Sequence, residues 1–206
     1  MSAQTNRQNV ANRFDLTKRL VARLKKNEAV IGGIGLTNFD LWAAKHRPQN
    51  FYMLGSMGLA VPIALGVAIA QPRRRVFALE GDGSLLMELG VLGTVAARKP
   101  ENLTIVIWDN GAYQITGGQP TTTASVVDLV AVARASGIAR ANWARDPADF
   151  EALVEQALAE KGPTFIAAKI DDKPAVATTH RDPQFLRETF MRDRKSTRLN
   201  SSHITI

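Results

Sequence analysis

Short apolar segments alternate with longer, helix-like segments along most of this chain. Two of the short segments, residues 76–79 and 104–107, run without a charged residue and without apolar–polar alternation. Strands of this kind are buried on both faces, as happens when helices cover both sides of a parallel sheet. The alternation therefore predicts an α/β fold with a doubly wound, mostly parallel sheet and right-handed crossovers.

The order of the expected elements follows from the same pattern. The expected strands are residues 29–34, 51–54, 75–80, 103–108, 138–142 and 164–170. The expected helices are residues 16–26, 37–45, 57–70, 84–97, 128–136 and 147–160, with Thr37 and Asp146 as N-caps. A loop rich in Gly and Thr occupies residues 109–123, and coil is expected around His180.

The length of 206 residues is most simply that of one domain with its own hydrophobic core. We expect residues 1–192 to form this domain. Residues 193–206 resemble an in-frame translation of a common sequencing-adapter oligonucleotide, so we expect a non-native tail there and exclude it from the fold.

The composition narrows the chemistry and the location. The chain has no cysteine, which excludes disulfides, zinc–thiolate sites and cysteine-ligated iron–sulfur clusters. Residues 1–12 are polar and lack the apolar region of a signal peptide. Both features are typical of a cytoplasmic protein, which is what we expect.

The net charge raises the possibility of a nucleic-acid partner, and a long uncharged stretch raises that of a membrane span. A net charge of +7 suggests a nucleic-acid partner, but much of it falls in one amphipathic stretch that predicts a solvated helix face. The basic residues there are Arg13, Lys18, Arg19, Arg23, Lys25 and Lys26, and the apolar ones are Phe14, Leu16, Leu20, Val21 and Leu24. Residues 48–72 lack charge, yet only residues 57–70 are convincingly helical, which is too short to span a bilayer. We expect neither a nucleic-acid nor a membrane partner.

Polar motifs follow two of the expected strands. Asp82 lies in a Gly-Asp-Gly-Ser segment. A spacer of 25 residues separates Gly83 from Asp109, and Asn110 follows Asp109 directly. Ligands of a parallel sheet bind beyond the carboxyl ends of its strands. The Asp82 carboxylate, the Asn110 side-chain carbonyl and a backbone carbonyl at Ala112 are oxygen ligands that suit Mg²⁺. We therefore predict a metal site at this edge.

The same segment has features of an anion site. Gly81 and Gly83 allow backbone N–H groups to approach a phosphate closely, and Ser84 begins the next helix, whose N-terminus favours anions. Each motif alone is also a common turn signal. Their combination at this spacing favours a diphosphate held through Mg²⁺.

These motifs resemble a known family. Residues 81–84, the 25-residue spacer and residues 109–113 resemble the cofactor motif of thiamine-diphosphate enzymes. The usual motif ends in Asn-Asn, so Asp109 departs from it and Asn110 matches. Residues 47–60 resemble the beta subunit of sulfopyruvate decarboxylases and the C-terminal half of phosphonopyruvate decarboxylases.

The resemblance extends over residues 14–192 and implies thiamine diphosphate and Mg²⁺ as cofactors. Met57 matches the apolar residue that wedges between the two cofactor rings, although in isolation it is also compatible with a core methionine. Gly55 matches the residue whose backbone carbonyl receives the pyrimidine amino group. The implied cofactor-binding residues are Gly55, Ser56, Met57, Gly81, Asp82, Gly83, Ser84, Asn110, Ala112 and Tyr113.

The resemblance also implies a second chain. In this superfamily a catalytic glutamate belongs to a pyrimidine-binding domain, for which this chain has too few residues. We expect a hetero-oligomer in which an alpha subunit supplies that glutamate. The implied reaction converts a small anionic 2-oxoacid to an aldehyde and CO₂.

Several alternatives remain open. The chain is also compatible with a subunit of a thiamine-diphosphate carboligase or 2-oxoacid oxidoreductase, or with a non-enzymatic nucleotide-binding α/β domain. The loop 114–121 has two glycines that could let it move over a substrate, and it fits a simple solvent loop equally well. His46, His180 and Glu88 are more typical of surface residues than of an acid or base.

Overall fold

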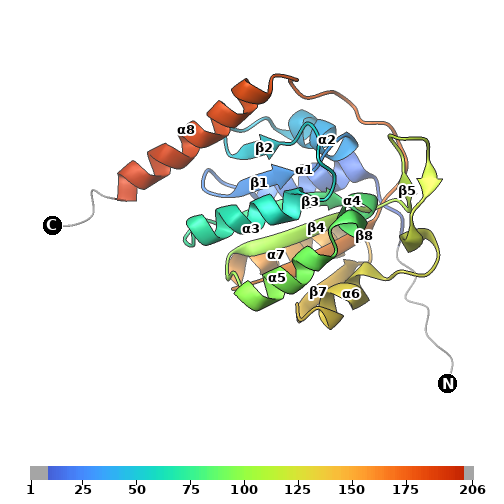
Figure 1. The fold of residues 1–206 in the computed structure, drawn as a ribbon. Coiled ribbons are helices and arrows are strands. Elements are labelled where there is room, and N and C mark those ends of the chain that lie inside the picture. The colour runs from blue at the N-terminus through green and yellow to red at the C-terminus, as the bar shows by residue number, and fades with distance from the viewer. Residues whose placement is uncertain (1–8, 202–206) are drawn as a thin grey trace.

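The computed structural model describes residues 9–201. Its centre is a six-stranded parallel sheet in the order β2-β1-β3-β4-β8-β7 (Figure 1). The strands are β1 (Ala29–Gly32), β2 (Asn50–Tyr52), β3 (Val76–Gly81), β4 (Leu103–Asp109), β7 (Arg140–Ala144) and β8 (Thr164–Lys169). A small antiparallel hairpin pairs β5 (Ala112–Tyr113) with β6 (Gln119–Pro120).

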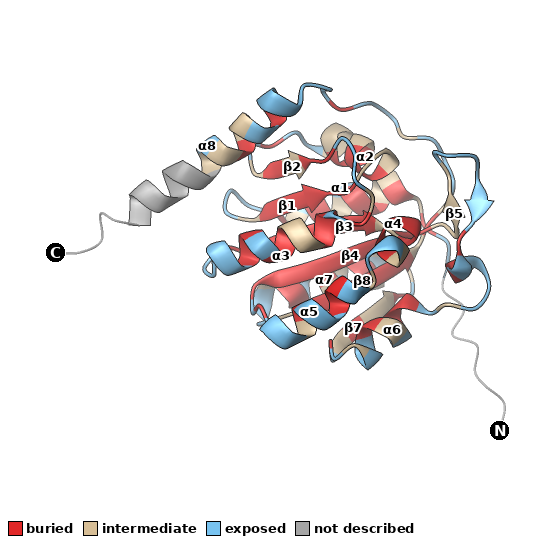
Figure 2. Cartoon of the chain, in the orientation of Figure 1, coloured by how far each residue is buried: buried red, intermediate tan, exposed pale blue. Residues whose placement is uncertain are grey.

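Helices cover both faces of the sheet, which confirms the predicted doubly wound α/β class. One layer contains α3 (Ala60–Ala70), α5 (Gly90–Arg98) and α6 (Leu129–Ala135), and the other contains α1 (Arg13–Arg23), α2 (Leu36–Ala44) and α7 (Pro147–Ala159). Along β4, Ile105 and Ile107 pack against the first layer, whereas Val106 and Trp108 pack against the second. The central strands of the sheet, β1, β3, β4 and β8, are consequently buried on both faces (Figure 2). Each fully buried aliphatic side chain contributes about 1.5–3 kcal/mol relative to exposure.

Three of the expected helices differ from the structure. The helix expected over residues 16–26 begins earlier, at Arg13, and ends at Arg23. The helix expected from residue 57 begins only at Ala60, because Ser56 and Gly58 have φ values of 66° and 87° in the left-handed region. The helix expected over residues 84–97 is split into α4 (Asp82–Met87) and α5. The break brings the side chain of Glu88 against Gly58, where an added Cβ would lie 2.6 Å from Glu88 Cγ. The turn that carries Met57 thus packs against the end of α4.

The predicted helix caps have different outcomes. Asp146 caps α7 as predicted, since its side chain accepts a hydrogen bond from the Asp149 N–H at 2.8 Å. Thr37 does not cap α2, because the helix begins at Leu36 and Gly35 occupies the N-cap position with φ of 68°. Only a residue without Cβ adopts that backbone easily.

The last helix, α8 (Pro183–Ser201), is not among the expected elements. Among its side chains that the structure describes, residues 183–193, those of Leu186 and Phe190 are buried, and the Phe190 ring lies 5.4 Å from that of Phe51. The helix continues into the expected tail, where the Asp193 carboxylate forms an ion pair of 2.6 Å with buried Arg74. Residues 202–206 of that tail lie outside the described residues, and its non-native origin stays a prediction.

The basic face of α1 is only partly solvated, which corrects the expectation for Arg13. Its guanidinium is buried, with 4% of the side chain exposed, and pairs with Asp40 at 2.7 Å. Arg19 and Arg23 pair with Glu151 of α7 at 3.0 and 2.8 Å. Neighbouring acidic side chains thus neutralise three of the charges that composition alone assigns to solvent.

No helix in residues 9–201 has both the length and the apolar character needed to cross a membrane.

Glu80 is a buried carboxyl group near the end of β3. Its Oε2 accepts a hydrogen bond of 3.0 Å from the Ala60 N–H, which joins the strand to the start of α3. Burial raises the pKa of Glu80 from 4.5 to about 7 because the ionised form loses its hydration.

This shift predicts how stability depends on pH. The folded chain holds the Glu80 proton more tightly than the unfolded chain does. The contribution of this proton to the free energy of unfolding is therefore complete below pH 4.5 and is lost as pH rises towards 7. In this window we expect Glu80→Gln to remove a decline of up to about 1.4 kcal/mol per pH unit. Urea denaturation of both proteins in a metal chelator measures it, and parallel pH profiles would contradict the assignment.

Candidate cofactor site

The carboxyl ends of four neighbouring strands form one edge of the sheet. After β1 the chain enters α2 on one face, and after β3 it enters α4 and α5 on the other. A crevice opens where successive connections leave towards opposite faces, and ligands of such sheets bind there. A cavity lies at this edge, lined by segments that follow β1, β3, β4 and β8.

Most of the predicted site residues line this one cavity. They are Met57, Gly81, Asp82, Gly83, Ser84, Asn110, Ala112 and Tyr113. Gly55 and Ser56 do not line it and lie on the exposed turn just before half-buried Met57. The structure therefore brings the two sequence motifs together and leaves this pair at the margin.

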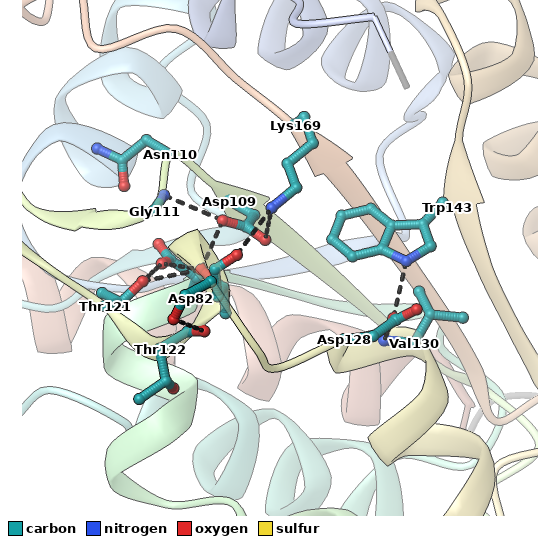
Figure 3. Close-up of polar contacts among 12 residues, drawn as sticks. Asp82, Asp109, Asn110, Gly111, Thr121, Thr122, Asp128, Val130, Trp143 and Lys169 are labelled. Atoms are coloured by element: carbon teal, nitrogen blue, oxygen red, sulfur yellow. Dashed lines mark hydrogen bonds and ion pairs between the residues drawn. The ribbon is translucent and has the colours of Figure 1, made fainter. Parts of the chain in front are cut away.

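Asp82 is fixed in the first turn of α4 by two hydroxyl groups. Its Oδ2 accepts hydrogen bonds from Thr121 Oγ1 at 2.6 Å (Figure 3) and from Thr123 Oγ1 at 2.9 Å. Burial raises the pKa of Asp82, and the nearby Asp109 charge adds to the effect, while the two hydroxyls act in the opposite direction. A carboxylate held in this way is favoured by a nearby cation.

Asn110 begins the turn that follows β4. Its Oδ1 accepts a hydrogen bond of 3.2 Å from the Ala112 N–H, and its Nδ2 donates to Gln114 Oε1 at 3.1 Å. Gly111 has φ of 70°, which allows the chain to reverse at this point. The turn therefore sets the orientation of the side-chain amide at the cavity.

The two glycines of the motif meet different surroundings. A Cβ on Gly83 would lie 2.5 Å from Tyr113 Cε1, so the missing side chain makes room for the tyrosine ring. A Cβ on Gly81 would have no neighbour within 4 Å. Gly83 thus allows the Tyr113 ring to pack closely against the start of α4, whereas the space next to Gly81 is open.

Several site residues were outside the sequence predictions. Thr121 and Thr123 hold Asp82, and Lys169 Nζ contacts Asp109 Oδ2 at 2.7 Å. The Gly- and Thr-rich loop of the sequence could have pointed to Thr121 and Thr123. A charged residue at the end of an apolar strand could have pointed to Lys169. Their partners are 39, 41 and 60 residues away along the chain, so local patterns did not identify the contacts.

The weaker candidates lie outside the cavity lining. His46 stacks near Trp42 and Tyr52, and the His180 ring is 5.0 Å from that of Phe185. Glu88 is exposed at the end of α4. All three are exposed, as expected of surface residues, and none of them lines the cavity.

The residues present fit Mg²⁺ with a diphosphate. Asp82 and Asn110 offer carboxylate and amide oxygens, and Mg²⁺ is often held by one or two carboxylates plus phosphate oxygens. Gly81 leaves open space, and the buried indole N–H of Trp108, which lines the same cavity, has no hydrogen-bond partner. An unpaired buried donor is costly unless a ligand or water completes it.

Comparisons with known proteins agree with this geometry. The family of thiamine pyrophosphate enzymes, through its C-terminal TPP binding domain, matches residues 34–168. The chain is 45% identical over 165 residues to the sulfopyruvate decarboxylase beta subunit of Methanothermobacter thermautotrophicus, covering 80% of this chain and 84% of the relative. It is 42% identical over 154 residues to the phosphonopyruvate decarboxylase of Streptomyces viridochromogenes, covering 75% of this chain and 38% of that protein. The predicted resemblance is confirmed.

A solved structure supports the fold. Benzoylformate decarboxylase from Polynucleobacter necessarius superimposes with a TM-score of 0.65 at 19% identity, covering 84% of this chain and 36% of the other. At this identity the likeness concerns the fold alone.

The two glycines provide a matched pair of variants. We expect Gly83→Ala to lower the free energy of unfolding by about 1–3 kcal/mol, because its Cβ would collide with the Tyr113 ring. Gly81→Ala should stay within about 0.5 kcal/mol of wild type, because its Cβ meets open space. Urea denaturation measures both, and equal losses would contradict the packing described.

Proposed function

This chain belongs to the thiamine pyrophosphate enzyme family, as a C-terminal TPP binding domain, and we propose on that premise that it is the diphosphate- and Mg²⁺-binding subunit of a two-chain 2-oxoacid decarboxylase. The observation that carries the proposal is the meeting of Asp82 and Asn110 at one cavity beyond the strand ends. The beta-subunit relative, of which 84% is covered, supports a separate subunit.

In this proposal the metal ligands are Asp82, Asn110 and the Ala112 backbone carbonyl. The Gly81–Ser84 segment faces the cavity at the start of α4, where its backbone N–H groups would bind the diphosphate. Thiamine diphosphate, when bound, supplies carbanion-stabilising chemistry. The work of this chain is to anchor and orient that group and to exclude water from one side of it.

Met57 would support the cofactor from a well-defined turn. The side chain is half-buried and lines the cavity, and the turn is packed on Glu88. Its neighbour Ser56 has φ of 66°, which is uncommon for a residue with a side chain and costs on the order of 1 kcal/mol or more. A costly backbone that persists next to a cavity supports a functional role for the turn. We assign Met57 the wedge position, with Gly55 supplying a backbone carbonyl.

An apolar rim beside the site supports a partner chain. Two exposed large apolar side chains, Leu54 at 44% and Ile115 at 57%, line a neighbouring cavity, and Ile115 also lines the first one. Met87 at the end of α4 is exposed at 54%. Grouped exposed apolar residues are typical of interaction sites. We propose that a pyrimidine-binding alpha subunit covers this rim and supplies the catalytic glutamate.

A second cavity offers a place for the substrate. It has a volume of about 750 Å³ and shares Ile34, Leu36, Gln114 and Ile115 with the first. The Thr179 hydroxyl in its wall is buried without a hydrogen-bond partner. Arg181 also lines it, and among the described side chains its guanidinium has no partner, whereas Arg13 of the first cavity is paired with Asp40. We propose that Arg181 and Thr179 bind the anionic group of the 2-oxoacid.

Co-expression tests the proposed function. We expect this chain, purified with a pyrimidine-binding chain encoded beside it, to release aldehyde and CO₂ from sulfopyruvate or phosphonopyruvate only with thiamine diphosphate and Mg²⁺. The chain alone should be inactive, and Asp82→Ala should weaken thiamine diphosphate binding by more than about 100-fold.

Glu155→Ala is a matched control, because it removes one carboxylate at an exposed ion pair on α7. Carboligation products in place of aldehyde would favour the other enzyme class. Full activity of the chain alone would overturn the two-chain arrangement. Absence of Mg²⁺-dependent thiamine diphosphate binding would indicate a different, non-enzymatic α/β domain.

The Arg181 assignment makes a separate prediction about specificity. We expect Arg181→Met to raise the KM for sulfopyruvate by about 10- to 100-fold, because a charge-assisted hydrogen bond is lost. The KM for pyruvate, which lacks the second anionic group, should change much less, and Arg181→Lys should keep part of the preference. Equal effects on both substrates would contradict the assignment.

A further inference from the structure

Two buried carboxylates lie next to each other at the cavity. Asp82 and Asp109 have exposed fractions of 2% and 1%. The Thr123 Oγ1 lies 2.9 Å from an oxygen of each, and 2.8 Å from Thr121 Oγ1. A hydroxyl has a single proton, so Thr123 can donate to only one of the two carboxylates at a time. Hydrogen bonds from this pair of threonines therefore leave the combined negative charge incompletely offset.

Lys169 is the cation that meets these carboxylates. Its Nζ contacts Asp109 Oδ2 at 2.7 Å (Figure 3), and 28% of its side chain is exposed. The other oxygen of Asp109 accepts the Gly111 N–H at 3.0 Å. Lys169 Nζ also lies 3.5 Å from the Thr123 carbonyl oxygen. Lys169 thus compensates Asp109 directly, and its links to Asp82 run through Asp109 and Thr123.

The position of Lys169 is set by the sheet. Lys169 ends β8 directly opposite Asp109 in the parallel register with β4. Its Nζ also lies 5.1 Å from the ring of Trp143 in β7. The Trp143 indole N–H donates to Asp128 Oδ1 at 2.9 Å, and Asp128 caps α6 (Figure 3). The ammonium group is therefore held from two sides by residues of rigid elements.

We propose that Lys169 is a positioning residue that sets the local charge beside the metal site, a role that rests on the proposed function. With Lys169 paired to Asp109, the formal charges of the three side chains sum to one net negative charge. Without the lysine they would carry two, and without the Asp109 charge they would carry none. A greater negative charge attracts Mg²⁺ and repels a diphosphate, so the two ligands must respond in opposite directions.

Charge variants of the assembled two-chain enzyme test this balance by calorimetry, with Mg²⁺ alone and with thiamine diphosphate at saturating Mg²⁺. We expect Lys169→Met to tighten Mg²⁺ binding and to weaken thiamine diphosphate binding, each by about tenfold. Asp109→Asn should change both in the reverse sense. The double variant should return both affinities to within about threefold of wild type.

Two further variants separate charge from packing. Lys169→Arg keeps the charge and should keep both affinities near those of wild type. Lys161→Met removes an exposed lysine at the opposite end of β8, where it pairs with Glu101, and should leave both affinities unchanged. Melting temperatures without ligands show whether each variant is folded, and if Lys169→Met is unfolded, Asp109→Asn decides the question.

Opposite signs for the two ligands would support the proposal. Weakening of both ligands by Lys169→Met without recovery in the double variant would show a purely structural role and overturn it. If the wild type binds no thiamine diphosphate, the proposed function fails, whereas the Mg²⁺ titrations still decide whether Lys169 sets the charge.

Discussion

The parallel pairing of β3 with β4 is the interaction on which the site depends. Gly81 lies opposite Trp108 in this register, so Asp82, which follows β3, and Asp109, the last residue of β4, come at the same level. A slip of one residue would turn every side chain of a strand to the other face. Because both faces are buried under helices, such a slip would disrupt two core layers at once. The core that stabilises the fold therefore also fixes the spacing of the polar groups.

The same argument extends across β4 to β8. Asp109 and Lys169 face each other because they occupy matched positions of paired strands. The threonines that hold Asp82 come instead from a short turn beyond the β5–β6 hairpin, which depends on Gly111 to reverse the chain. The sheet thus fixes the positions of the charged side chains Asp109 and Lys169, and a loop supplies the hydroxyl groups that orient Asp82.

The sequence predicts the sheet better than the surface elements. Strands 75–80 and 103–108 agree with β3 and β4 to within one residue, because two buried faces require continuous apolar runs. The helix α8 is missed because, over its described residues 183–193, few apolar side chains are buried. The prediction that Arg13 is solvated is wrong because its partner, Asp40, lies on another helix. The site motifs are found from local spacing, but their ligand roles stay predictions. Contacts between distant segments, such as Thr123 with Asp82, do not appear in periodicity.

Two indole rings flank the candidate site. Trp108 lies in its wall with an unpaired N–H, and Trp143 contacts Lys169, while the chain has three tryptophans in all. Indole emission depends on local polarity and on nearby charge. We therefore expect the intrinsic fluorescence of Trp108 to change when a ligand enters the cavity, and that of Trp143 to change with the charge of Lys169, so that no attached dye is needed.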